Sequence, residues 1–227
     1  MKLLNVVSAS IAGALMIASV SAQAISIRIT DLDTLDTTGQ IDGAAGLVNF
    51  SGAVGGTSTF NVGLSAGSSV NDVIQSILTQ TTLNVTGAGR LQIELSETGF
   101  TGGAQSPLLS SLSFTANGTL LQGMKVTVQS FVDDGDVLFA QTDEIGAGPI
   151  ELLATNDSET LTDSAALSPT FSITTIALIE STDLTGKPGR ATFDATSIAA
   201  VPVPAPILLF GTALAGMAMM GRRRKRV

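Results

Sequence analysis

The sequence predicts an all-β protein: an antiparallel two-sheet sandwich, jelly-roll-like, with one short helix, flanked by an N-terminal signal peptide and a C-terminal transmembrane helix. Three observations support this prediction. Between residues 25 and 200, short apolar runs are separated by Gly, Ser and Thr turns roughly every ten residues. Residues 1–24 have the pattern of an export signal. Residues 201–227 combine prolines, an apolar segment and a basic end.

Four segments have the pattern of strands. Residues 25–30 read ISIRIT and residues 91–96 read LQIELS, so apolar and polar side chains alternate with the period of a half-buried strand. Residues 168–182 and 190–198 supply late strands of the same composition. A parallel β-solenoid is the rival architecture, but it needs a fixed repeat, and the Gly, Asn and Thr positions show no period.

Two hairpins are predicted from turn residues. Residues 124–141 look like two strands joined at Asp134-Gly135, and residues 46–62 look like two strands joined at Gly55-Gly56. Glycine suits both turns because it accepts the positive φ that a tight hairpin demands.

One segment predicts a short helix across one end or edge of the sheets. In residues 69–80, SVNDVIQSILTQ, Ser69 precedes Asp72 by three positions, which is close to a capping box. The apolar residues that recur at helical spacing are Val70, Val73, Ile74, Ile77 and Leu78.

The body of the protein is strongly acidic. All 19 acidic residues lie between Asp31 and Asp194, whereas six of the 11 cations lie in the two end segments. Residues 25–200 therefore carry 5 cations against 19 acids, a net charge of −14. The five cations are scattered, which argues against nucleic acid as a partner. Acidity of this size keeps an exported protein soluble or attracts divalent cations.

Four residue types are missing from the sequence, namely Cys, His, Trp and Tyr. Without Cys or His, disulfides, histidine-based triads, thiol nucleophiles and the usual zinc sites are excluded. Without Trp or Tyr, the usual aromatic platforms for stacking sugars are missing as well. We expect no cofactor and no enzymatic activity.

The N-terminal 24 residues predict export. Lys2 precedes an apolar stretch over residues 6–20, and Ala22 and Ala24 are the small residues that a signal peptidase reads. Cleavage is therefore expected after Ala24. The alternative is a retained N-terminal membrane helix, which the short apolar stretch disfavours.

The C-terminal 27 residues have three parts. Residues 201–206 alternate Val or Ala with proline, residues 207–221 are uncharged, and residues 222–226 are all basic. As a helix, residues 207–221 span about 22 Å, less than the roughly 30 Å hydrocarbon core. The segment is marginal as a permanent anchor, and its cations should stay on the cytoplasmic side. A buried core helix would not adjoin five cations.

This three-part tail resembles a PEP-CTERM sorting signal of the VPxPA type. The resemblance implies export in a Gram-negative bacterium, recognition by an exosortase and an inner-membrane intermediate before release to the cell surface or extracellular matrix. The residues that carry it are Val201, Pro202, Val203, Pro204, Ala205, Pro206, Arg222, Arg223, Arg224, Lys225 and Arg226. The tail lacks the commonest Pro-Glu-Pro core. Residues 46–56, 95–102 and 131–139 also resemble uncharacterised β-rich domains that precede such tails.

Two acidic clusters are weak metal candidates. Residues 31–42 contain Asp31, Asp33, Asp36 and Asp42, but an aspartate stands where a calcium loop needs its glycine. Asp133, Asp134 and Asp136 form a denser cluster, although Asp-Gly is favoured in hairpin turns for backbone reasons alone. Both clusters are interpreted as turn residues, and no metal site is assigned. No carboxylate pair stands out for glycoside hydrolysis.

The sequence therefore predicts a non-catalytic exported surface or extracellular-matrix protein. Its expected partners are signal peptidase, an exosortase and, transiently or permanently, the inner membrane. The mature protein is expected to associate with exopolysaccharide or a biofilm matrix. The alternative is a bitopic membrane-anchored protein with an extracytoplasmic β-sandwich that binds calcium or carbohydrate.

Overall fold

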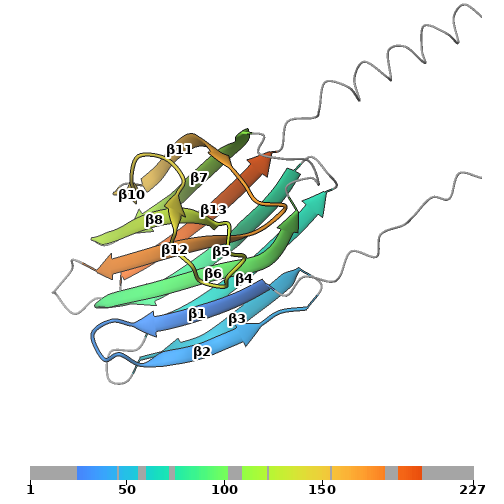
Figure 1. Ribbon diagram of the computed structural model, residues 1–227. Helices are drawn as coiled ribbons and strands as arrows, with labels where there is room; N and C mark the ends of the chain where they lie inside the picture. Colours follow the sequence, from blue (N-terminus) through green and yellow to red (C-terminus); the bar gives the residue numbers. More distant parts are fainter. Residues whose placement is uncertain are drawn as a thin grey trace, which may run out of the picture.

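A computed structural model describes residues 25–44, 46–55, 60–71, 75–101, 109–121, 123–153, 155–181 and 189–200. These residues form two antiparallel sheets packed face to face, without a helix (Figure 1). Over the same ranges, no helical segment could cross a bilayer. The predicted signal peptide (residues 1–24) and sorting tail (residues 201–227) lie outside the described residues.

The first sheet, sheet A, has the strand order β10-β8-β12-β6-β1-β2, with β9 also paired to β8. All of its described pairings are antiparallel. Its strands are β1 (Ile25–Asp31), β2 (Thr37–Asp42), β6 (Arg90–Thr101), β8 (Met124–Asp133), β9 (Asp143–Glu144), β10 (Ile150–Leu152) and β12 (Thr170–Ser181).

The second sheet, sheet B, has the order β11-β7-β13-β5-β4-β3, again antiparallel in every described pairing. Antiparallel pairing throughout excludes a parallel solenoid for these residues. Its strands are β3 (Leu47–Val54), β4 (Phe60–Asn71), β5 (Gln75–Gly87), β7 (Leu109–Leu121), β11 (Thr155–Ala166) and β13 (Gly189–Ala200).

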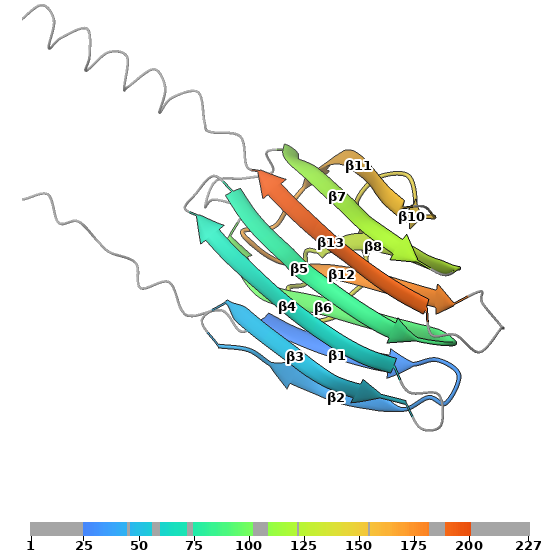
Figure 2. The same ribbon diagram turned by 180° about the vertical axis from the view of Figure 1, so that it is seen from behind.

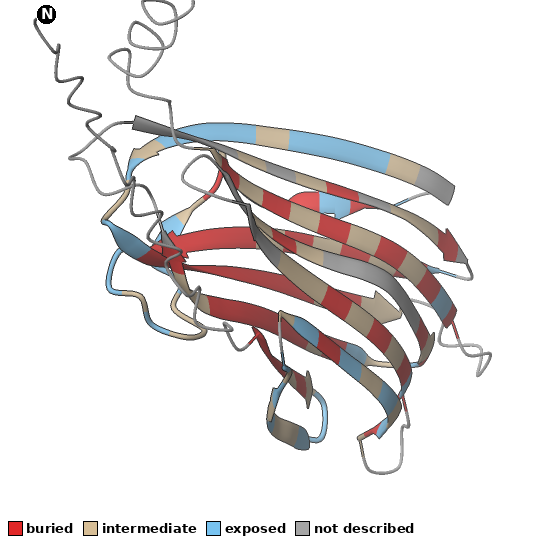
Figure 3. Ribbon diagram, turned by 90° about the vertical axis from the view of Figure 1, so that its right-hand side faces the viewer, coloured by how far each residue is buried: buried red, intermediate tan, exposed pale blue. Residues whose placement is uncertain are grey.

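The core lies between the two sheets and follows the predicted alternation. Buried and less buried residues alternate along the strands (Figure 3). The apolar positions predicted to face inward, Ile25, Ile27, Ile29, Leu91, Ile93 and Leu95, are all fully buried. Each such side chain contributes about 1.5–3 kcal/mol by leaving water. The strand assignments for residues 25–30 and 91–96 are therefore confirmed.

Three hydroxyl groups interrupt the apolar core and join the sheets. Ser197 of β13 lies 2.6 Å from the Ser130 hydroxyl of β8 and 3.1 Å from the Thr175 hydroxyl of β12. All three residues are buried. Because each hydroxyl finds a partner, the cluster avoids the cost of an unsatisfied polar group in the core.

The predicted helix over residues 69–80 is wrong. Residues 60–71 form β4 and residues 75–87 form β5, paired with each other as a hairpin. Pairing with β4 on one side and β13 on the other satisfies the backbone of β5. Its β-branched residues suit a strand, with Leu78 buried and Ile77 on the opposite face. Apolar spacing alone could not separate the two structures over so short a segment.

One predicted hairpin is confirmed and the other is only partly right. β3 and β4 pair antiparallel up to Val54 and Phe60, as expected for the hairpin, while residues 56–59, with Gly56 of the predicted turn, lie outside the described residues. β8 ends at Asp133 as predicted, but residues 137–141 form a loop, and only Asp143–Glu144 return to pair with β8. This loop carries positive φ at Asp136 and Phe139, which a regular strand cannot accommodate.

Candidate functional site

Three of the four aspartates in the segment 31–42 accept hydrogen bonds from the protein's own groups. The Asp31 carboxylate, at the end of β1, accepts hydrogen bonds from the amides of Asp33 and Thr34, at 2.9 and 3.1 Å. Asp33 pairs with Arg90 at 2.9 Å, and the hydrogen bonds from Arg90 lower the pKa of Asp33. This segment therefore forms a self-capped turn between β1 and β2.

The carboxylates of the other two aspartates, Asp36 and Asp42, do not cap this turn. Asp42 accepts hydrogen bonds from the Ser26 hydroxyl and the Gln40 amide, at 2.6 and 2.7 Å, and these lower its pKa. Asp36 is exposed.

The second acidic cluster is also divided among separate partners, three backbone amides and one hydroxyl. Asp133 accepts from the Thr142 hydroxyl and the Val137 amide, Asp134 from the Ser168 amide and Asp136 from the Gly99 amide. Each carboxylate thus fixes a different part of the loop after β8. Over the described ranges, no three acidic residues come together as a metal site would require.

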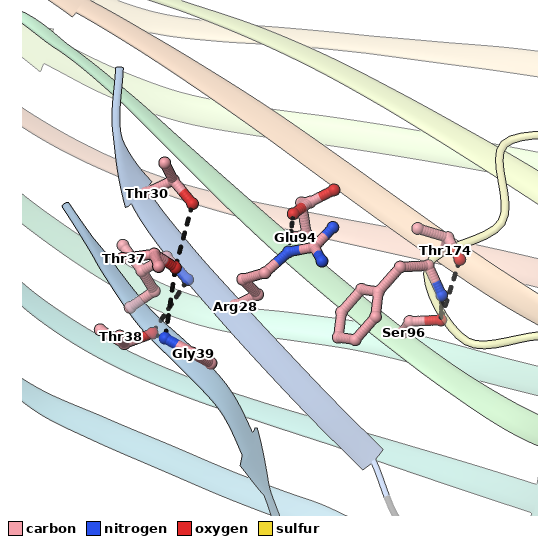
Figure 4. Close-up of polar contacts among 10 residues, drawn as sticks. Arg28, Thr30, Thr37, Thr38, Gly39, Glu94, Ser96 and Thr174 are labelled. Carbon is pink, nitrogen blue, oxygen red and sulfur yellow. Dashed lines mark hydrogen bonds and ion pairs between the residues drawn. The ribbon is translucent and has the colours of Figure 1, made fainter. Parts of the chain in front are cut away.

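The outer face of sheet A carries a partly covered ion pair (Figure 4). The Arg28 guanidinium of β1 lies 2.5 Å from the Glu94 carboxylate of β6, whose side chain is only 4% exposed. The Phe139 ring lies over Arg28 at 4.7 Å, a cation–π contact. The Phe139 amide donates to Ser96, which also bonds the Thr174 hydroxyl. These contacts hold the loop after β8 against sheet A, so they have a structural explanation.

Charge is distributed unequally between the two sheets. The strands of sheet A contain twelve charged residues. By contrast, β7, β13, β5, β4 and β3 of sheet B contain only Arg190 and Asp194. The acids of the edge strand β11 are Asp157, Glu159 and Asp163. Sheet B therefore carries five charged residues against twelve in sheet A, and three of the five lie on its edge strand β11.

The outer face of sheet B carries a ladder of threonines. Strand register places Thr160 of β11 opposite Thr115 of β7, Thr115 opposite Thr196 of β13, and Thr196 opposite Thr79 of β5. The Thr160 and Thr115 hydroxyls lie 2.9 Å apart. With strands about 4.8 Å apart, the four residues span roughly 14 Å. Figure 2 shows sheet B in front, with no described segment crossing this face.

Two shallow hollows, of about 300 Å³ each, also open on the outer side of sheet B. The first is lined by hydroxyl residues together with two aspartates and Phe193, and the second by hydroxyl, amide, glycine and small apolar residues. The first includes Thr119, Asp157, Ser158, Thr192 and Asp194, and the second includes Ser51, Asn61, Gly63 and Thr86. Threonine is favoured on strands for packing reasons alone. The combination of the ladder, the hollows and the low number of charges makes this face the candidate binding surface.

No family profile matches this chain, and no curated protein matches it. Among solved structures, the enzymatically active domain of tailspike protein 4 from bacteriophage CBA120 is 13% identical, with a TM-score of 0.30 over 61% of this chain and 19% of that one. The Arthrobacter globiformis T6 isomalto-dextranase complexed with panose is 11% identical, with a TM-score of 0.25 over 78% of this chain and 30% of that one.

A family two carbohydrate esterase from Cellvibrio japonicus is 13% identical, with a TM-score of 0.22 over 69% of this chain and 36% of that one. This chain therefore spans between 19% and 36% of the length of these three structures. Likenesses of this size carry no argument about function.

Proposed function

We propose that this protein is a non-catalytic, exported surface or extracellular-matrix protein, released by an exosortase, whose sheet B binds uncharged polysaccharide. In this proposal the body is a jelly-roll-like β-sandwich. The single observation that carries the binding role is the sparsely charged, hydroxyl-bearing face of sheet B on a body of net charge −14.

The chemistry of the face fits a neutral polyhydroxyl partner. Hydroxyl and amide groups both donate and accept hydrogen bonds, as sugar hydroxyls do. An anionic polymer would meet repulsion from the acidic body, and a cationic one would be drawn to the charged strands of sheet A instead. A neutral polymer is the partner for which the least charged face is the best surface.

The sequences on either side of the body support export and processing. Residues 1–24 have the pattern of an export signal, and residues 201–227 combine the Pro motif, apolar segment and basic end that resemble a sorting signal. The acidic clusters hold turns and loops in place, which supports a non-catalytic role.

Binding is tested with the exported protein purified from a Gram-negative host, using cellulose and carboxymethyl cellulose as probes in sedimentation assays. We expect binding to cellulose that persists at high salt and weaker binding to the carboxymethylated polymer. The double variant Thr115→Val, Thr196→Val keeps shape and strand preference but removes two hydroxyls. At about 1 kcal/mol each, this should weaken cellulose binding roughly 10- to 30-fold.

The matched control is Thr30→Val, Thr127→Val on the outer face of sheet A, which should bind like the wild type. Equal losses in both double variants, or a preference for the charged polymer, would refute the assignment to sheet B.

The alternative, a permanently anchored protein with an extracytoplasmic binding domain, differs in the fate of its tail. Intact mass of the protein from its natural host decides between them. Loss of residues 222–226 supports sorting, and their retention in a host that has the exosortase supports the anchor.

A further inference from the structure

Glu97 is a buried acid that no described group neutralises. It follows Leu91, Ile93 and Leu95 on the inner face of β6, and its residue is 0% exposed. Neither carboxylate oxygen has a hydrogen-bond partner. Such a group is costly in a protein interior unless a partner arrives.

The described neighbours of Glu97 carry no charge. Strand register places Ile25 of β1 on one side of it and Ile173 of β12 on the other. The Ser68 hydroxyl of β4 lies near the carboxyl from sheet B and interacts with it weakly, but neither oxygen has a partner at full hydrogen-bond geometry. Burial raises the pKa of Glu97 to about 7, and only the Ser68 hydroxyl opposes this shift.

Ile25, which lies opposite Glu97 on β1, is the first residue expected after signal-peptide cleavage. The Gly43 amide donates to the Ile25 carbonyl at 2.8 Å, so the backbone edge of Ile25 faces β2 rather than β6. Ile25 and Glu97 therefore form a pair without mutual backbone hydrogen bonds, the arrangement in which Cα atoms are about 4.5 Å apart. The Ile25 N–H points toward β2, as its carbonyl does, so an ammonium at this nitrogen would meet Glu97 across the inner face of the sheet. The nitrogen is about 1.46 Å from its Cα and therefore roughly 6 Å or less from the Glu97 Cα, a distance that an extended glutamate side chain and one hydrogen bond can cover.

We propose that Glu97 is the binding site for the α-ammonium group that cleavage after Ala24 creates at Ile25. This inference rests on the proposed export. In the hydrolysis, the water hydroxyl goes to the Ala24 carbonyl carbon and the water proton to the Ile25 nitrogen. The new amine takes up a further proton, because its ordinary pKa is about 7.7–8.0 and a nearby carboxylate raises it.

The consequence is that maturation stabilises the body. The precursor has an amide at this position and a buried carboxyl without a partner among the described residues. The mature chain has an ion pair, which fixes the first residue of β1 against β6. Removing one partner of such a buried pair is strongly destabilising.

The test is a double-mutant cycle in the full chain, exported and processed by the host. One change inserts a glycine between Ala24 and Ile25, which moves the ammonium by about 3.5 Å; the product is called the insertion chain. The other change is Glu97→Gln. Intact mass identifies the N-terminus of every sample, and melting temperature and the pKa of the terminal amine are measured.

We expect the insertion to lower the melting temperature by roughly 5–10 °C with Glu97 present, and by less than about 2 °C in the Glu97→Gln background. The amine pKa should lie above its ordinary range in the wild type and return to it after Glu97→Gln. A mature chain that begins at Ile25 without this coupling overturns the pairing alone. A mature chain that begins at another residue overturns the cleavage prediction as well, so the two failures are distinguishable.

Discussion

The pH dependence of stability should expose the burial of Glu97 most clearly when the ammonium is displaced. In the insertion chain, Glu97 remains buried without a close cation. Its pKa in the folded protein is about 7, against an ordinary value of 4.5. Between these two values the unfolded chain has released the proton and the folded chain still holds it, so stability falls as pH rises.

The size of this loss follows from the two pKa values. This pKa difference corresponds to a loss of about 3 kcal/mol in the free energy of unfolding between pH 4.5 and pH 7. Above pH 7, Glu97 contributes little further loss. For a domain of this size the loss corresponds to roughly 6–12 °C in melting temperature. Glu97→Gln cannot ionise and should not show it.

Differential scanning calorimetry from pH 4.5 to pH 8.5 measures the effect as the difference between the insertion chain and its Glu97→Gln variant. Glu159→Gln, an exposed substitution on β11, is the matched control and should leave the pH profile of the insertion chain unchanged. Parallel profiles for the insertion chain and its Glu97→Gln variant would refute the burial of an unpaired carboxyl.

Three further predictions concern the fold and the acidic turns. Ser197→Ala should cost about 1–3 kcal/mol in urea unfolding, because it removes the hydroxyl that two other buried hydroxyls share; an unchanged midpoint would contradict the hydroxyl cluster. Gly43→Ala should be strongly destabilising because the added Cβ would lie 2.2 Å from the Leu47 carbonyl oxygen. Gly67→Ala, whose Cβ would have its nearest neighbour at 3.7 Å, should be tolerated. Equal melting temperatures of the two variants would contradict the close approach at Gly43. Calcium should leave the melting temperature nearly unchanged, and Asp134→Asn should lower it equally with and without calcium; a calcium-dependent rise of several degrees would show a metal site instead.

The strands could be predicted where side chains alternate along the chain. Ile25, Ile27 and Ile29 show the inward face of β1 directly, because a period of two is a local property. The same rule extended along β6 would have shown Glu97, which continues the inward series of Leu91, Ile93 and Leu95. The charge of Glu97 hid it, since acids are almost never fully buried without a partner.

The candidate surface could not be predicted from the sequence. Thr79, Thr115, Thr160 and Thr196 become neighbours only through the register of four strands that are far apart in the chain. The wrong helix over residues 69–80 has the same origin, because pairing of β5 with β4 and β13 decided its structure. Both depend on long-range pairing, which local patterns do not determine.

Binding of neutral polysaccharide to the sparsely charged face of sheet B is tested most directly by hydroxyl-radical footprinting. The exported protein is footprinted with and without cellulose. Peptides that cover β7, β13 and β5 should be protected by the polymer. Peptides from β1, β8 and β12, whose outer faces belong to sheet A, should not change. Protection confined to sheet A, or no protection at a polymer concentration that sediments the protein, would contradict the account.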